Sequence, residues 1–140
     1  QRMLWEEEDQ TRLSLQQPAA DIAELSRLNA AGLSVEHVLP QNPAFDIASY
    51  GFKDAEEFEE HKHRLGNLLL LEKGLNSACQ NATVESKVTV PTLYAASGLV
   101  SVKALAASRV GKPLGYRLEH IESRSQSLAQ LMLQRWPITA

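Results

Sequence analysis

The chain has 140 residues and a net charge of −3, with 44% hydrophobic and 22% charged residues, which excludes a disordered or membrane-embedded chain. Its longest run of large aliphatic residues, 68–71, is far below the roughly 20 residues of a membrane helix, and no signal-peptide pattern opens it. The single Cys79 excludes an internal disulfide and a thiolate zinc cage, so we expect an intracellular, cytoplasmic protein with no membrane contact.

Apolar spacing along the chain predicts a mostly helical protein with one short two-stranded ribbon. The first strand is expected at 33–39, where Pro40 ends it, and the second at 68–71, where Gly66 and Asn67 introduce it. The stretch between the strands is expected to be mostly loop up to the next helix. Helices are predicted at 2–13, 18–30, 54–64, 76–81, 84–97 (where Pro91 favours an interruption), 99–109 and 116–135.

Single residues set several of these boundaries. Pro18 suits the first turn of its helix, where a missing N–H costs nothing, and Gly32 is expected to stop that helix. Asp54 is a good N-cap, with Glu57 as its capping-box partner. Asn76 is expected to cap the short helix that follows the second strand.

Charge is unevenly distributed along the chain. Residues 1–60 carry four basic and thirteen acidic side chains, a net charge of −9, whereas 61–140 carry ten basic and four acidic ones, a net charge of +6. A basic second half is suited to binding phosphates, while the acidic first half faces solvent or another domain. On charge alone, two ordinary solvated halves are an equally open alternative.

A carboxylate and an imidazole stand side by side in the run Val-Glu-His-Val-Leu-Pro-Gln at 35–41. The Glu36 carboxylate suits a hard divalent cation such as Mg²⁺, and a neutral His37 imidazole is the usual general base near pH 7. Taken alone the pattern is weak, because a structural histidine would look the same. Neighbouring strand residues also face opposite sides of a sheet, so Glu36 and His37 can converge only where the strand bends.

A second pattern, Leu-Gly-Asn followed by four leucines, occupies 65–71, and a further asparagine, Asn76, comes after it. An asparagine such as Asn67 at the start of an apolar strand commonly satisfies backbone groups of a turn, and Asn76 resembles a helix cap. Each asparagine alone therefore favours a structural role. It is their order after Glu36 and His37 that points to chemistry.

The combined motifs resemble the HNH endonuclease signature, and in particular the C-terminal nuclease module of GmrSD-type, modification-dependent restriction systems. In that family an acid-His-x-x-Pro strand precedes Gly-Asn-Leu-x-Leu, a further Asn and a downstream Lys. The matching residues occur here in the same order: Glu36, His37, Pro40, Gly66, Asn67, Leu68, Leu70, Asn76 and Lys87. The Arg-Trp-Pro ending at 135–137 also looks like the family's last helix.

The resemblance implies a mostly α fold of the α+β class with a small embedded ββα-metal (HNH) motif. Two antiparallel strands and a helix would hold a single divalent cation, Mg²⁺ or Mn²⁺. It further implies that His37 deprotonates the attacking water, that Glu36 and Asn76 ligate the cation, and that Asn67 ties the loop between the strands and orients His37. Two oxygen ligands suit such hard cations, whereas further His or Cys ligands would favour zinc.

The resemblance also implies one HNH nuclease domain over 1–140 that is a piece of a larger protein. Its parts are a helical lead-in at 1–32, a ββα-metal core at about 33–83 and a helical C-terminal part at 84–140. The long insertion between the two strands is expected to form part of the DNA-binding surface or to pack against another domain.

Several basic residues flank the site in sequence. Arg64 and Lys73, with Lys62 and His63, are suited to bind DNA phosphates, and Lys87, which matches the family's downstream lysine, is expected to contact a phosphate as well. An ordinary surface lysine is the competing interpretation of Lys87.

The predicted function is a metal-dependent DNA endonuclease module of a restriction or phage-defence protein. Its partners would be DNA and a nucleotide-dependent N-terminal sensing domain in the full-length chain. One alternative is a catalytically inactive HNH-like module that binds nucleic acid or protein. Another is an all-helical interaction module in which the histidine, the glutamate and the asparagines are incidental.

Overall fold

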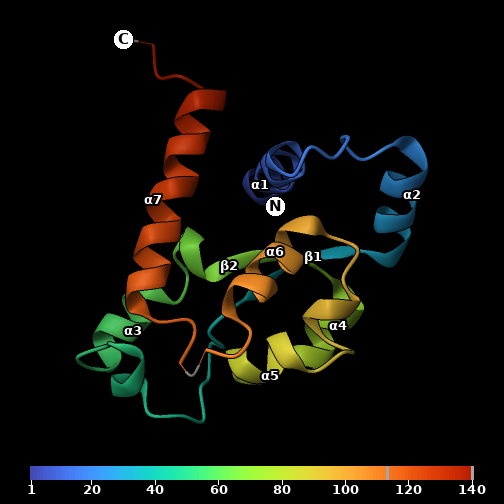
Figure 1. The fold of residues 1–140 in the computed structure, drawn as a ribbon. Helices are drawn as coiled ribbons and strands as arrows, with labels where there is room; N and C mark the ends of the chain where they lie inside the picture. The colour runs from blue at the N-terminus through green and yellow to red at the C-terminus, as the bar shows by residue number, and fades with distance from the viewer. Residues whose placement is uncertain (113, 140) are drawn as a thin grey trace.

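The computed structural model describes residues 1–112 and 114–139. It is mostly helical with one small two-stranded antiparallel sheet, so the expected α+β class is confirmed at this level (Figure 1). No helix among these residues combines the length and the apolar character needed to cross a bilayer. The helices are α1 (Arg2–Ser14), α2 (Ile22–Ala31), α3 (Ala55–His61), α4 (Lys73–Cys79), α5 (Val84–Thr89), α6 (Val100–Arg109) and α7 (Leu118–Arg135), with the short 3-10 helices η1 (Ile47–Tyr50), η2 (Leu65–Asn67) and η3 (Tyr94–Ala96).

The sheet pairs β1 (Leu33–His37) with β2 (Leu68–Glu72) in an antiparallel register that places His37 opposite Leu68. Successive strand residues face opposite sides, yet residues 69–71 are all buried, so both faces of β2 are covered. Helices α1 and α6 pack against β2, and α4 packs against both strands. A strand covered on both faces needs a continuous apolar run, which explains the four consecutive leucines.

Helix α7 approaches the 3-10 helix η2 so closely that only glycine fits at the contact. A Cβ atom on Gly66 would lie 1.9 Å from the carbonyl oxygen of Ile121. The Gly66 amide donates to Ser125 Oγ at 2.8 Å, and its carbonyl oxygen accepts from the Tyr116 hydroxyl. The glycine of the Leu-Gly-Asn motif is therefore set by the packing of α7 against η2.

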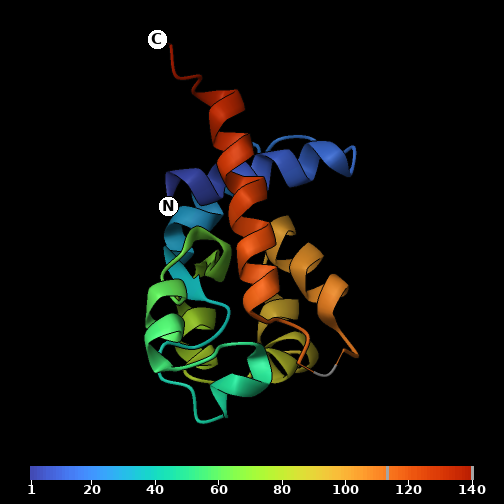
Figure 2. The same cartoon turned by 90° about the vertical axis from the view of Figure 1, so that its left-hand side faces the viewer.

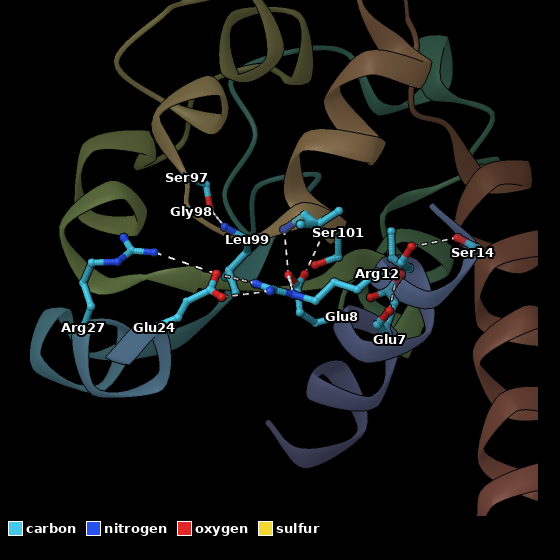
Figure 3. Close-up of polar contacts among 12 residues, drawn as sticks. Glu7, Glu8, Arg12, Ser14, Glu24, Arg27, Ser97, Gly98, Leu99 and Ser101 are labelled. Atoms are coloured by element: carbon cyan, nitrogen blue, oxygen red, sulfur yellow. Dashed lines mark hydrogen bonds and ion pairs between the residues drawn. The ribbon is translucent and has the colours of Figure 1, made fainter. Parts of the chain in front are cut away.

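A buried carboxylate on α1 joins the N-terminal helix to the distant helix α6. Glu8 is fully buried and accepts hydrogen bonds from the backbone amides of Val100 and Ser101, each at 2.7 Å, where α6 begins (Figure 3). The first amides of a helix lack intrahelical partners and favour negative charge, so this carboxylate acts as an N-cap supplied from another helix. Arg12 neutralises Glu8 at 3.0 Å and binds Glu24 of α2 at 2.7 Å.

A second ion pair joins α1 to α7, which cross each other in Figure 2. Glu7 Oε2 lies 2.6 Å from Arg124 Nη2. Arg124 also donates to the carbonyl oxygens of Gly66 at 2.9 Å and Leu68 at 2.6 Å. Helix α1 is thus connected through one arginine to the start of β2.

Several predicted helix boundaries are confirmed. Asp54 caps α3 by accepting the amide of Glu57 at 2.8 Å. Gly32 follows the last residue of α2 with a φ of 72°, a conformation that glycine adopts without strain. Pro18, however, lies ahead of α2 and not in its first turn, because the N-cap of α2 is Asp21.

The strand predicted at 33–39 ends at His37. The backbone amide of Leu39 is bound by Asn67 Oδ1 at 2.8 Å, which removes it from the ladder. Asn67, the residue just before the partner strand β2, therefore ends β1 earlier than Pro40 would.

Two predicted helices also differ from the structure. The helix predicted at 84–97 ends at Thr89, two residues before Pro91, as expected when a proline follows. Asn76 lies inside α4 and does not cap it, because the helix begins directly after β2.

Candidate active site

The end of β1 places the Glu36 and His37 side chains in different environments. Glu36 is buried, with 3% of its surface exposed, whereas His37 is half-buried. This is the alternation expected of strand neighbours, so the two side chains leave the strand on opposite sides. Both residues nevertheless border one polar cleft, described below.

Glu36 is held by Lys87 and Tyr94. The fully buried Lys87 donates through Nζ to Glu36 Oε1 and to the carbonyl oxygens of His37 at 2.7 Å and Val38 at 3.1 Å. The Tyr94 hydroxyl donates to the same Oε1 at 3.1 Å. Burial raises the pKa of Glu36, and the adjacent Lys87 ammonium opposes that rise. Helix α5 thereby fixes the backbone at the end of β1.

Three of the basic residues expected to bind phosphate lie in different places. Lys87 has no exposed surface and gives its hydrogen bonds to protein acceptors, which corrects its interpretation as a DNA contact. Arg64 is exposed just ahead of η2, at the same end of the sheet as His37. Lys73 is exposed at the start of α4, which the register places at the opposite end of the sheet.

The side chain of Asn67 is fully buried and all of its hydrogen bonds go to the backbone. Its Oδ1 accepts from the amide of Leu39, and its Nδ2 donates to the carbonyl oxygens of Leu39 at 3.0 Å and Lys62 at 2.9 Å. Asn67 therefore joins the segment just after His37 to the turn that follows α3.

The imidazole of His37 lies between two other side chains. Its Nε2 is 3.0 Å from Nδ1 of His63, with the rings edge-to-face and their centroids 5.1 Å apart. Its Nδ1 is 3.3 Å from the side-chain nitrogen of Gln41. Burial lowers the pKa of His37 to about 4, and nearby His63, Lys87 and Lys62 act in the same direction. An imidazole that is uncharged at neutral pH is able to accept a proton.

Asn76 reaches from α4 to β1 on the other side of the cleft. Its Nδ2 donates to Ser34 Oγ at 2.8 Å and to the carbonyl oxygen of Val35 at 3.1 Å. The cleft between these elements has a volume of about 210 Å³, and a larger cavity of about 330 Å³ between α1, α6 and α7 shares no residue with it. The cleft is lined by Val35, Glu36, His37, Pro40, Gln41, Asn42, Asn76, Gln80 and Asn81.

This geometry can be compared with known proteins. The family model of GmrSD restriction endonucleases, C-terminal domain, matches residues 2–131. The chain belongs to this family. No curated protein and no solved structure gives a significant match. The match extends from α1 into α7, so the lead-in helix and the cleft lie within the same GmrSD C-terminal domain, a module of restriction endonucleases.

The cleft of the GmrSD domain offers two oxygen atoms suited to a hard cation. Within the described residues, Glu36 Oε2 accepts from no side chain and Asn76 Oδ1 takes part in no hydrogen bond. Lys87 and Tyr94 both bind Oε1, so Oε2 is the oxygen of this buried carboxylate that no side chain occupies, and Glu36 lines the cleft. One carboxylate oxygen and one amide oxygen fit Mg²⁺ or Mn²⁺.

The donor set is small. Residues 1–112 and 114–139 contain no group of three or more His, Cys, Asp or Glu side chains arranged to hold a metal. Water and substrate oxygens would have to supply the remaining ligands, as is usual for Mg²⁺. The residues therefore fit a weakly held hard cation and not a zinc cage.

Two neighbours of His37 have little signal in the sequence. His63 is 26 residues away from His37 and stands out only as one of several flanking basic residues. Gln41 lies four residues after His37 at the end of the same motif, and nothing in its residue type marks it. His63 could be found only once the turn after α3 was placed beside the end of β1, and Gln41 only once the path of the chain after β1 was known.

Proposed function

We propose that this domain is a metal-dependent DNA endonuclease of the HNH type, in which His37 activates water for attack on a phosphodiester bond. The observation that carries the proposal is the polar cleft where an uncharged imidazole borders the oxygen donors of Glu36 and Asn76. The β1–β2 ribbon, followed directly by α4 packed on both strands, supports a ββα-metal arrangement.

Hydrolysis of a phosphodiester needs a base for water and a counter-charge for the leaving oxygen. His37 accepts the water proton, because its lowered pKa keeps it uncharged at neutral pH. Glu36 and Asn76 would hold Mg²⁺ or Mn²⁺, which when bound supplies Lewis-acid stabilisation to the phosphate oxygens. Lys87 binds the carbonyl oxygens of His37 and Val38, and Asn67 binds Leu39, so two buried side chains fix the backbone that carries the imidazole.

The low pKa of His37 describes the protein without substrate. A phosphate in the cleft adds negative charge beside the imidazole, and negative charge favours the protonated form. Bound phosphate therefore acts to raise the pKa of His37 above about 4, while the positive charge of a bound cation acts in the opposite direction.

DNA would lie over the surface that carries His37 and the turn after α3. Arg64 and His63 are exposed there, and Lys62 is half-buried beside them. Like other members of the GmrSD family, the full-length protein would combine this module with a nucleotide-dependent sensing domain and act in restriction of foreign DNA. That assembly is part of the proposal.

The test is cleavage of modified and unmodified supercoiled plasmid by the full-length protein and by this chain, with Mg²⁺, Mn²⁺ or EDTA. Nicked or linear product that needs the cation and is lost in His37→Ala supports the proposal. His120→Asn, which alters a histidine outside the cleft, is the matched control for folding and for contaminating nuclease. Cutting by His37→Ala at the wild-type rate contradicts it.

Metal ligation by Asn76 is tested by a separate measurement. Asn76→Ala should raise the cation concentration for half-maximal cutting by about tenfold, the usual cost of losing one supporting group of a metal site. An unchanged titration would remove Asn76 from the ligand set. DNA binding without cutting under every condition would favour the alternative, a catalytically inactive binding module.

A further inference from the structure

We propose that His63 is a positioning residue for His37. His63 accepts a hydrogen bond from the Nε2–H group of His37. Nδ1 of His37 is then the unprotonated nitrogen, and it faces the cleft. The inference rests on the proposed function, because it names the nitrogen atom that accepts the proton of water. It assigns a role to a histidine that neither the motif nor the family match singles out.

The two hydrogen bonds of His37 agree on one tautomer. The side-chain nitrogen of Gln41, an obligate donor, lies 3.3 Å from His37 Nδ1, so this nitrogen carries a lone pair. In a neutral imidazole the proton is then on Nε2, which lies 3.0 Å from His63 Nδ1. His63 Nδ1 is therefore the acceptor, and the tautomer of one imidazole is set by the contact of its other nitrogen.

The positions of the two partners indicate which nitrogen of His37 lies on the side of the cleft. Gln41 lines the cleft together with His37, whereas His63 does not line it. The Nδ1 side of the His37 ring is therefore the side that carries Gln41, a residue of the cleft that Glu36 and Asn76 also line. A water molecule that displaces the side-chain nitrogen of Gln41 would hydrogen-bond directly to the lone pair of His37 Nδ1.

The buried Asn67 side chain holds both imidazoles in place. Its Oδ1 and Nδ2 bind Leu39, two residues after His37, and its Nδ2 also binds the carbonyl oxygen of Lys62, the residue before His63. The turn is further fixed by the Arg64 amide, which donates to the carbonyl oxygen of His61 at 2.9 Å. The backbone that carries each of the two imidazole rings is thus restrained by these hydrogen bonds.

The neighbouring histidine cannot take this role. His61 is buried and its Nδ1 lies 2.7 Å from the carbonyl oxygen of Glu57, while its Nε2 lies 3.5 Å from Glu122 on α7. Its two nitrogens are therefore used inside the fold. His63, on the exposed turn, is the one that reaches His37.

The first test is the tautomer itself, measured without metal or DNA. Long-range ¹H–¹⁵N spectra of the chain labelled with ¹⁵N-histidine at neutral pH report which ring nitrogen is protonated, and His37→Ala assigns the His37 signals. We expect the Nε2–H form of His37 in the wild type. We expect the same form in His63→Asn, whose side-chain oxygen can replace Nδ1 as acceptor, and a mixture of tautomers in His63→Leu.

The second test is the rate of cutting under single-turnover conditions with saturating DNA. His63→Leu should lower this rate by at least about tenfold with little change in DNA affinity, as for the loss of a group that orients a catalytic imidazole. His63→Asn should restore most of the rate, and His120→Asn should have no effect on either measurement.

Three results would overturn the inference. One is an Nδ1–H form of His37 in the wild type, and another is a His63→Leu variant with unchanged tautomer and rate. The third is a His63→Leu variant that loses DNA affinity alone, which would make His63 a phosphate contact. If the wild-type protein cuts no DNA at all, the proposed function fails, and the spectra still decide whether His63 sets the tautomer of His37.

Discussion

The side-chain amide of Asn67 binds the backbone of Leu39 at both ends, with Oδ1 2.8 Å from its amide nitrogen and Nδ2 3.0 Å from its carbonyl oxygen. We predict that Asn67→Ala lowers the free energy of unfolding by roughly 3 kcal/mol, because buried backbone groups lose their partners. Asn67→Asp should cost more, since a carboxylate cannot donate to the two carbonyl oxygens. Urea denaturation measures both.

An exposed asparagine provides the comparison for this prediction. Asn29→Ala on α2 should change stability by no more than about 0.5 kcal/mol. Equal midpoints for the Asn67 and Asn29 variants would mean that the three hydrogen bonds of Asn67 contribute nothing to the fold.

Lys87 and Arg64 should have opposite phenotypes. Lys87→Met leaves the buried Glu36 carboxylate without its counter-ion, and we expect a loss of about 3–5 kcal/mol in unfolding free energy. Arg64→Ala should leave stability unchanged and reduce the salt dependence of DNA binding by about one counter-ion. If Lys87→Met were as stable as the wild type and bound DNA more weakly, the lysine would be a phosphate contact after all.

Alanine substitutions at Gly66 and Gly74 should change the stability of the fold in opposite directions. Gly66→Ala should destabilise the fold by about 3 kcal/mol or more, because its Cβ would meet the carbonyl oxygen of Ile121 at 1.9 Å and the backbone of α7 must move. Gly74→Ala in α4 has no atom within 4 Å of the new Cβ, so it should stabilise the protein by about 0.5 kcal/mol through helix propensity. Thermal unfolding of the two variants checks both signs, and a Gly66→Ala variant as stable as Gly74→Ala would contradict the close approach of α7.

Glu8 tests the connection between α1 and α6. Glu8→Ala removes the acceptor of two amides at the start of α6 and one partner of Arg12, and we expect a loss of about 3 kcal/mol. Glu60→Ala, at an exposed position, should have little effect. The cutting rate per folded Glu8→Ala molecule should equal that of the wild type, because Glu8 is not part of the cleft. A slower rate at full occupancy of the folded state would mean that α1 acts on the site.

Local patterns predict much of this fold, since caps, prolines and apolar spacing act on neighbouring residues. The Asp54 cap and the strand at the four leucines depend on residues close in sequence and are found in the structure. The end of β1 and the partner of Glu36 depend on side chains 28 and 51 residues away, which no local pattern contains. Lys87 shows the difference most clearly, because its place in the motif order could not say whether it was buried.

The candidate site likewise combines residues that a sequence motif contains with residues that only the fold brings together. The motif identifies Glu36, His37 and Asn76 by residue type and order, and the structure brings all three to one cleft. The second imidazole is 26 residues from the first, and only the fold of the turn after α3 brings them together. The candidate residues of the cleft could thus be named from the sequence, whereas the side chains that contact His37 from elsewhere in the chain required the three-dimensional arrangement.

The ion pair between Glu7 and Arg124 spans 117 residues of the chain. A nascent chain grows at roughly 5–20 residues per second, so α1 is synthesised on the order of ten seconds before its partner on α7. During that time the first helix has acidic groups that are ion-paired only in the completed fold. The pairing of α1 with α7 is therefore a late event in the synthesis of this domain, and a translation product that stops before Arg124 lacks the contact that joins α1 to the start of β2.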